Sequence, residues 1–123
     1  YWKFPVVSSC GSLICPTTVT HPQQLPSYSV VGPGTLQSVT CTLKDTAYPW
    51  MSWYLQEARG QLHFLVQSGT KDDQEEILWG GTSYRSKRVS NLELTLEMKN
   101  VTQSQTIYCT CSKEHSERSE RRW

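Results

Sequence analysis

Five cysteines in a chain of only 123 residues constrain this protein more than any other feature of its sequence. They are Cys10, Cys15, Cys41, Cys109 and Cys111. In a small chain rich in serine, threonine and turn residues, cysteines at this density are typical of disulfides formed in an oxidising compartment. At most two pairs form within the chain, so we expect one thiol to be left over. Zinc is the alternative, but Cys109 and Cys111 are closer together than the cysteine pairs of zinc fingers, and we expect no metal site.

Positive and negative side chains nearly balance, with 12 lysines and arginines against 11 aspartates and glutamates and a net charge of +1. This balance excludes the strongly basic surface with which proteins bind nucleic acids. No apolar run approaches the roughly 20 residues that a membrane-spanning helix needs. A chain of this length has room for one compact domain.

Short segments of alternating apolar and polar residues, separated by turn residues, predict an all-β fold. Trp53 and Leu55 fall on one face of such a segment, and Leu92, Leu94 and Leu96 fall on one face of another. We expect these side chains in the core. Strands that recur about every eight to twelve residues indicate a two-sheet sandwich.

The spacing of Cys41, Trp53 and Cys109 indicates which kind of sandwich this is. Trp53 lies 12 residues after Cys41, and Cys109 lies 68 residues after it. A tryptophan between two widely separated cysteines is typical of immunoglobulin domains. The 68-residue interval between the two cysteines is long enough for the extra pair of strands of a variable-type immunoglobulin domain. The sequence therefore resembles that type of domain.

The residues around this trio are similar to a T-cell receptor beta chain variable segment over about residues 19–114. The likeness is carried by VTHP at residues 19–22, WYLQ at 53–56, GQLHFL at 60–65 and TIYCTCS at 106–112. It implies a Greek-key sandwich closed by a Cys41–Cys109 disulfide. Closing so long a loop would contribute roughly 4 kcal/mol on the chain-entropy model.

Three features depart from the family pattern. Gln103 stands six residues before Cys109, where the family has an aspartate, so we expect the usual ion pair there to be missing. Ile107 stands at the tyrosine-corner position, and Tyr108 comes one residue late. The joining motif F-G-x-G does not follow Ser112, so we expect the final strand of the sandwich to be missing.

The two ends of the chain lack strand character. We expect residues 1–18 to be a leader remnant or a disordered tail, residues 19–114 to form the domain, and residues 115–123 to be a disordered charged tail. A recombination-signal heptamer translated in this frame encodes the sequence His115, Ser116 and Glu117. We therefore hypothesise that the chain is an unrearranged variable segment translated past its junction.

The resemblance implies that loops at one end of the sandwich bind antigen. It also implies that Tyr54, Gln56 and Leu62 pack against a partner variable domain, and Asn100 begins an N-glycosylation acceptor triplet. The candidate antigen-binding residues belong to three loops. They are Lys44, Asp45, Tyr48 and Trp50; Gln67, Ser68, Thr70, Lys71 and Asp72; and Ser112, Lys113 and Glu114.

By this resemblance the protein is a receptor domain without a cofactor. It would pair with a second receptor chain and recognise peptide held by a histocompatibility molecule, on the extracellular face of the plasma membrane after passage through the secretory pathway. A cell-adhesion or co-receptor immunoglobulin domain would use the same core and is the alternative. We do not expect an enzyme, because Cys10 or Cys15 with His21 or His63 lacks a local catalytic signature. How Cys10, Cys15 and Cys111 pair stays open.

Overall fold

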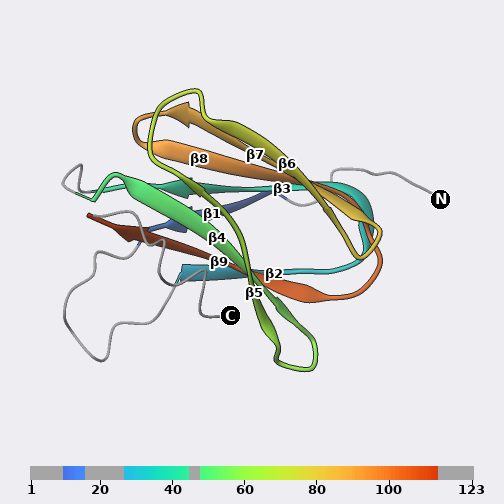
Figure 1. The fold of residues 1–123 in the computed structure, drawn as a ribbon. Helices are drawn as coiled ribbons and strands as arrows, with labels where there is room; N and C mark the ends of the chain where they lie inside the picture. Colours follow the sequence, from blue (N-terminus) through green and yellow to red (C-terminus); the bar gives the residue numbers. More distant parts are fainter. Residues whose placement is uncertain (1–9, 16–26, 45–47, 114–123) are drawn as a thin grey trace.

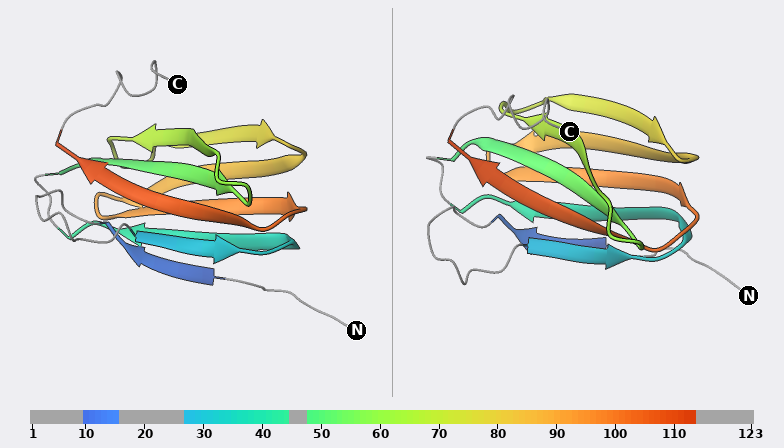
Figure 2. Two further views of the ribbon diagram at one scale, coloured as in Figure 1. Left: turned by 90° about the horizontal axis from the view of Figure 1, so that it is seen from below. Right: turned by 60° about the horizontal axis from the view of Figure 1, so that its bottom comes forward.

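Nine strands run through residues 10–15, 27–44 and 48–113, the part of the chain that this computed structural model describes (Figure 1). The sheets have the orders β1-β3-β8-β7-β6 and β2-β9-β4-β5, and they stack as two layers (Figure 2). The strands are β1 (Cys10–Ile14), β2 (Ser27–Val31), β3 (Gly34–Thr42), β4 (Trp50–Glu57), β5 (Leu62–Ser68), β6 (Gln74–Trp79), β7 (Thr82–Ser90), β8 (Glu93–Val101) and β9 (Gln105–Ser112). The expected all-β, immunoglobulin-like sandwich is confirmed.

Turn chemistry explains how neighbouring strands connect. The β6–β7 hairpin reverses through Gly80 and Gly81, both at positive φ (62° and 83°). Two-residue hairpin loops with positive φ at both positions match the twist of the flanking strands, and glycine adopts this conformation without steric cost. The β4–β5 turn contains Gly60 at a φ of 97°.

The core lies between the sheets and follows the alternation of the strands. Trp53, Leu55, Leu94 and Leu96 are fully buried, as expected from the sequence. Cys41 and Cys109 form the disulfide that the resemblance implies, with Cα atoms 6.4 Å apart. Ile107 is fully buried in the core.

Leu92 is the exception among the expected core residues. It lies in the turn between β7 and β8, and 43% of its surface is exposed. The prediction was wrong because β8 begins only at Glu93, so the alternation that buries Leu94 and Leu96 does not extend back to Leu92.

The N-terminal part of the sandwich also differs from the expectation. β1 runs parallel to β3, with Cys10 opposite Ser38 and Ile14 opposite Thr42. Cys15 follows β1 and forms a disulfide with Cys111. Residues 10–15 are therefore part of the sandwich, and the expected domain start at residue 19 lies too far along the chain.

The position of β2 bears on the expectation that the final strand is missing. In a variable-type sandwich the last strand pairs beside the strand that carries the second cysteine. Here β2 takes that position, antiparallel to β9, with Ser27 opposite Cys109. No strand follows β9 within the described ranges. β6 also differs from the variable-type arrangement, because it pairs with β7 rather than joining the sheet of β4 and β5.

β1 and β2 lie side by side at one edge of the sandwich (Figure 2) although they belong to different sheets. The hydroxyl of Ser27 donates a hydrogen bond to the carbonyl of Ile14 over 2.5 Å. Together with the Cys15–Cys111 disulfide, this contact joins the two layers along that edge.

Candidate functional site

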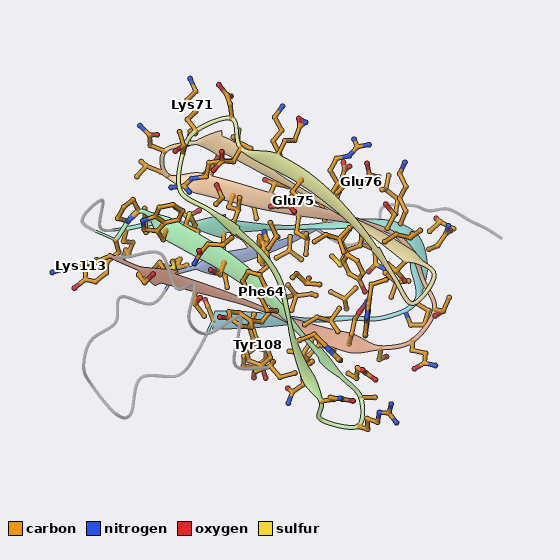
Figure 3. The ribbon with its side chains drawn as sticks, in the orientation of Figure 1. Phe64, Lys71, Glu75, Glu76, Tyr108 and Lys113 are labelled. Atoms are coloured by element: carbon orange, nitrogen blue, oxygen red, sulfur yellow. A yellow bond between two sulfur atoms is a disulfide. The ribbon has the colours of Figure 1, made fainter. Side chains whose placement is uncertain are left out.

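Aromatic and cationic side chains from separate loops meet at one end of the sandwich. The Lys113 ammonium lies 5.4 Å from the centre of the Tyr48 ring, a cation–π distance. Trp50 pairs with Ser112 across β4 and β9, and its indole ring packs directly on Gly69. In Figure 3, Lys113 and Lys71 project at this end. The structure thus brings parts of all three predicted loops together.

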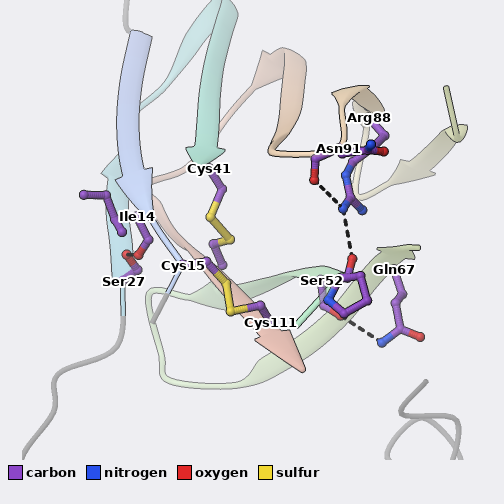
Figure 4. Close-up of a disulfide and its surroundings, with 11 residues drawn as sticks. Ile14, Cys15, Ser27, Cys41, Ser52, Gln67, Arg88, Asn91 and Cys111 are labelled. Carbon is purple, nitrogen blue, oxygen red and sulfur yellow. Dashed lines mark hydrogen bonds between the residues drawn. A yellow bond between two sulfur atoms is a disulfide. The ribbon is translucent and has the colours of Figure 1, made fainter. Parts of the chain in front are cut away.

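A buried arginine binds the strand ends and connections at this end of the sandwich. We call this end, which carries the three predicted loops, the loop end. Arg88 on β7 is only 1% exposed, and its guanidinium donates five hydrogen bonds. Four go to the backbone carbonyls of Pro49, Ser68, Ser90 and Asn91 at 2.9–3.0 Å, and one goes to the Ser68 hydroxyl. Figure 4 shows the bond to Asn91. Pro49 and Asn91 belong to two connections between strands, and Ser68 and Ser90 are the last residues of β5 and β7. Arg88 is therefore a structural centre of the loop end.

The electrostatics of Arg88 follow from its position. Burial lowers the pKa of Arg88, since it disfavours the charged guanidinium, and the nearby carboxylate of Asp73 partly opposes this effect. A rigid fork of donors that stays charged suits a site where several carbonyls converge. Sequence reasoning missed Arg88, because a strand arginine that bonds mainly to backbone carbonyls leaves no motif.

Asp73 organises the second loop. Its Oδ2 accepts hydrogen bonds from the N–H groups of Gly69 and Thr70 and from the Ser68 hydroxyl, all at 2.9–3.0 Å. Burial opposes ionisation of Asp73, but the bonds from Thr70, Gly69 and Ser68 and the charge of Arg88 outweigh it and lower the pKa of Asp73. The loop therefore has a defined shape at neutral pH.

The predicted loop residues divide by exposure. Lys44, Thr70, Lys71, Asp72 and Lys113 are exposed, and Tyr48, Trp50 and Ser112 are half-buried.

Four of the predicted loop residues lie at the ends of strands instead: Trp50 begins β4, Gln67 and Ser68 end β5, and Ser112 ends β9. Ser68 is 2% exposed, so the expectation that it contacts a ligand is wrong. Gln67 lies on β5, where its amide donates to the Ser52 hydroxyl over 3.1 Å (Figure 4). β5 continues through Ser68, and the loop starts two residues later than the sequence suggested. Asp45 and Glu114 lie outside the described residues.

A row of four aromatic side chains crosses the outer face of the four-stranded sheet. Tyr28, Tyr108, Tyr54 and Phe64 are opposite one another in successive strand pairs. Ring centres are 5.7 Å apart for Tyr28 and Tyr108, and 5.6 Å apart for Tyr54 and Phe64, within the range of favourable aromatic pairs. Figure 3 shows Phe64 and Tyr108 on this side. We call these four residues the aromatic row.

A second row runs beside the aromatic row. It consists of Val30, Thr106, Gln56 and Leu62, again in register across the four strands. Gln56 is held in place, because its carbonyl accepts a 2.7 Å bond from the Tyr108 hydroxyl and its amide donates to the carbonyl of Gly60. Leu62 is 41% exposed. The predicted interface residues Tyr54, Gln56 and Leu62 therefore share one face, and strand alternation alone would have added Phe64 and Tyr108.

The two disulfides lie next to each other in the core (Figure 4). Sulfur atoms of Cys15, Cys41 and Cys109 lie within 4.8 Å of one another. All are engaged in disulfides, so a metal ion would have to compete with covalent bonds.

His63, one of the two histidines considered for catalysis, has partners of its own, and the other, His21, lies outside the described residues. The Nε2 of His63 lies 2.6 Å from Glu57 Oε2, and its ring packs against Trp79 with centres 4.6 Å apart. The hydrogen bond from His63 lowers the pKa of Glu57, burial opposes the shift, and Arg59 adds to it from 3.3 Å. Cys15, one of the two cysteines considered as its nucleophile, is bound in a disulfide.

Comparison with known proteins adds no relative. No protein-family model matches the chain, and no curated protein matches it. Within residues 10–15, 27–44 and 48–113, no helix is long and apolar enough to cross a membrane. The fold and its two candidate surfaces, the loop end and the aromatic row, are therefore the basis for assigning function.

Proposed function

We propose that this protein is the variable-type recognition domain of an antigen receptor at the cell surface. It pairs with a second receptor chain through the outer face of the four-stranded sheet, and its loops bind peptide held by a histocompatibility molecule. The observation that carries the proposal is the aromatic row, because four aromatic rings in register on the outer face of a sheet form the kind of surface that a partner protein covers.

The chemistry of that face suits a protein interface. The centre of a protein interface is typically rich in tyrosine and phenylalanine and poor in charge. The four rings of the aromatic row satisfy this, and the second row adds Val30 and Leu62 around the polar pair Thr106 and Gln56. The outward positions of these two rows carry no lysine, arginine, aspartate or glutamate. Gln56 is already oriented by Tyr108 and Gly60, so little side-chain entropy is lost on binding.

The loop end is suited to bind a mixed polar and apolar surface. Tyr48 and Trp50 supply ring area at low conformational cost, and Lys71, Asp72 and Lys113 supply exposed charge of both signs. Arg88 and Asp73 keep the connections rigid, which lowers the entropic cost of binding. The two disulfides support an extracellular location, where such bonds persist.

Co-expression tests the pairing step. The secreted chain is produced with a panel of variable domains from candidate second receptor chains, and heterodimers are measured by analytical ultracentrifugation. Leu62→Arg places a charge on the proposed interface and is expected to weaken the heterodimer roughly tenfold or more. Leu78→Arg is the matched control, because Leu78 is 76% exposed on β6 in the other sheet.

The outcomes separate the possible roles. A heterodimer that is weakened by Leu62→Arg and unaffected by Leu78→Arg supports the proposed interface. The purified heterodimer is then applied to a panel of peptide-loaded histocompatibility molecules, and binding that is lost on Lys113→Glu supports the ligand class. A chain that stays monomeric with every partner overturns the pairing, and an adhesion or co-receptor role would then be tested.

A further inference from the structure

A glycosylation acceptor triplet lies at the end of the sandwich opposite the loop end. Asn100, Val101 and Thr102 span the end of β8 and the turn that follows. Leu94, Leu96 and Met98 point into the core, so strict alternation would also turn Asn100 inward. The backbone at Asn100 instead has a φ of 61°, which exposes Asn100 and buries Val101. The acceptor side chain is therefore presented to solvent.

An open cavity of about 190 Å³ lies beside this turn. Its wall includes Trp79 from β6, Thr82 from β7, and Thr102, Gln103 and Ser104 from the β8–β9 turn. The Thr82 hydroxyl donates to the carbonyl of Asn100 over 2.9 Å, so the acceptor residue and the cavity wall are in direct contact. The backbone of Asn100 thus borders the cavity wall, and Thr102 of the same triplet lines the cavity.

The lining of the cavity has the chemistry that a sugar ring requires. Trp79 is 38% exposed and is packed against His63, so its indole is held in place while much of it faces outward. A pyranose presents an apolar C–H face that packs on an indole, and its hydroxyl and acetamido groups hydrogen-bond to amide and hydroxyl side chains. Gln103, Ser104 and Thr102 provide such groups on the neighbouring wall.

We propose that Asn100 carries an N-linked glycan whose first sugar packs in this cavity against Trp79. The glycan would then cover a hydrophobic side chain at the base of the sandwich and stabilise the domain. This inference does not depend on what the loop end binds. It needs only passage through the secretory pathway, which the disulfides support.

Asparagine also tolerates the left-handed backbone better than most residues, so Asn100 has a conformational role whether or not it is glycosylated. The test therefore leaves Asn100 intact and changes Thr102, which is exposed. The full chain is secreted from mammalian cells with an added leader. Thr102→Ala removes the acceptor triplet, and Thr102→Ser preserves it as the matched control. Mass spectrometry of tryptic peptides measures occupancy of Asn100.

Packing on Trp79 is tested with the same pair of variants. We expect glycosylated Thr102→Ser protein to melt about 4 °C higher than unglycosylated Thr102→Ala protein, and the difference to vanish when both carry Trp79→Ala. The indole N–H resonance of Trp79 should shift between the two proteins, and trimming the glycan to its first sugar should not reverse the shift.

Either of two results would overturn the proposal. One is an unoccupied Asn100 in secreted protein. The other is an occupied Asn100 with an unchanged Trp79 resonance and the same melting difference with and without Trp79. In that second case the glycan is present but extends into solvent.

Discussion

Arg88 allows a direct test of how the loop end is held together. Replacing it with lysine keeps the positive charge but removes the planar fork of donors. Lysine has three donors on one nitrogen, whereas the guanidinium makes five bonds to groups that approach from several directions. Pro49 and Asn91 share one guanidinium nitrogen, and Ser68 is bound by another. One ammonium group cannot satisfy all of them.

The expected cost follows from the bonds that are lost. A hydrogen bond to a charged group contributes roughly 1.5–3 kcal/mol, and a buried carbonyl left unpaired costs a similar amount. If lysine keeps three of the five bonds, the loss of the other two, at the lower end of this range, should lower the free energy of unfolding of Arg88→Lys by about 3 kcal/mol. That is a large part of the roughly 5–15 kcal/mol that a typical domain possesses.

Urea unfolding at pH 7, followed by tryptophan fluorescence, measures this loss. Arg85→Lys is the matched control, because Arg85 lies on the same strand with its side chain exposed. We expect the control to stay within about 0.5 kcal/mol of the unmodified chain. If Arg88→Lys is no more destabilising than Arg85→Lys, then the guanidinium does not hold the loop connections and the reasoning is refuted.

Three further predictions test the core and the loops. Cys111→Ser should free the Cys15 thiol for titration in urea and destabilise the domain by about 3.5 kcal/mol. The Cys41–Cys109 disulfide already closes most of the loop, so the second disulfide constrains only residues 15–41 and 109–111 of the unfolded chain. Equal urea midpoints for the Cys111→Ser variant and the unmodified chain would contradict this. Gly69→Ala should drive the Trp50 indole off the loop, since a methyl group there collides with the ring, and we expect a red-shifted fluorescence that Gly32→Ala, with open space around it, does not produce. Burial raises the pKa of Tyr84 to about 12. As pH rises above 10, the unfolded state therefore loses the Tyr84 phenol proton before the folded state does, and the free energy of unfolding should fall by at most about 1.4 kcal/mol per pH unit. Tyr84→Phe should remove that contribution to the slope, and Tyr28→Phe, on the exposed face, should retain it.

The sequence predicted those parts of the fold that depend on local alternation and on the cysteine–tryptophan spacing. Trp53, Leu55, Leu94 and Leu96 lie in the core because alternation places them there. β1 could not be predicted in the same way, because a short strand that pairs in parallel with β3 has no hairpin signal. The Cys15–Cys111 bond was equally hidden, since sequence alone does not determine disulfide connectivity.

The candidate surfaces were predictable to different degrees. The shared face of Tyr54, Gln56 and Leu62 follows from the alternation of side chains along the strands. The same alternation predicts that Phe64 and Tyr108 lie on this face. The aromatic row as a whole needs the register between four strands, which only the structure provides. Ser68 and Leu92 were misplaced because strand ends, rather than strand interiors, decided their exposure. Arg88 acts through backbone carbonyls, and their positions depend on the folded loops.

The Cys15–Cys111 disulfide has a mechanical consequence. A pulling force that enters the chain before Cys15 and leaves after Cys111 passes through this one covalent bond. The intervening sandwich then carries no tension, and the chain between the two cysteines, which are separated by 96 positions, is not extended by the force. After reduction of both disulfides, stretching should release about 330 Å of additional contour length, at roughly 3.4 Å per residue. The domain is thus a load-bearing link whose extension under force depends on the redox state of its surroundings.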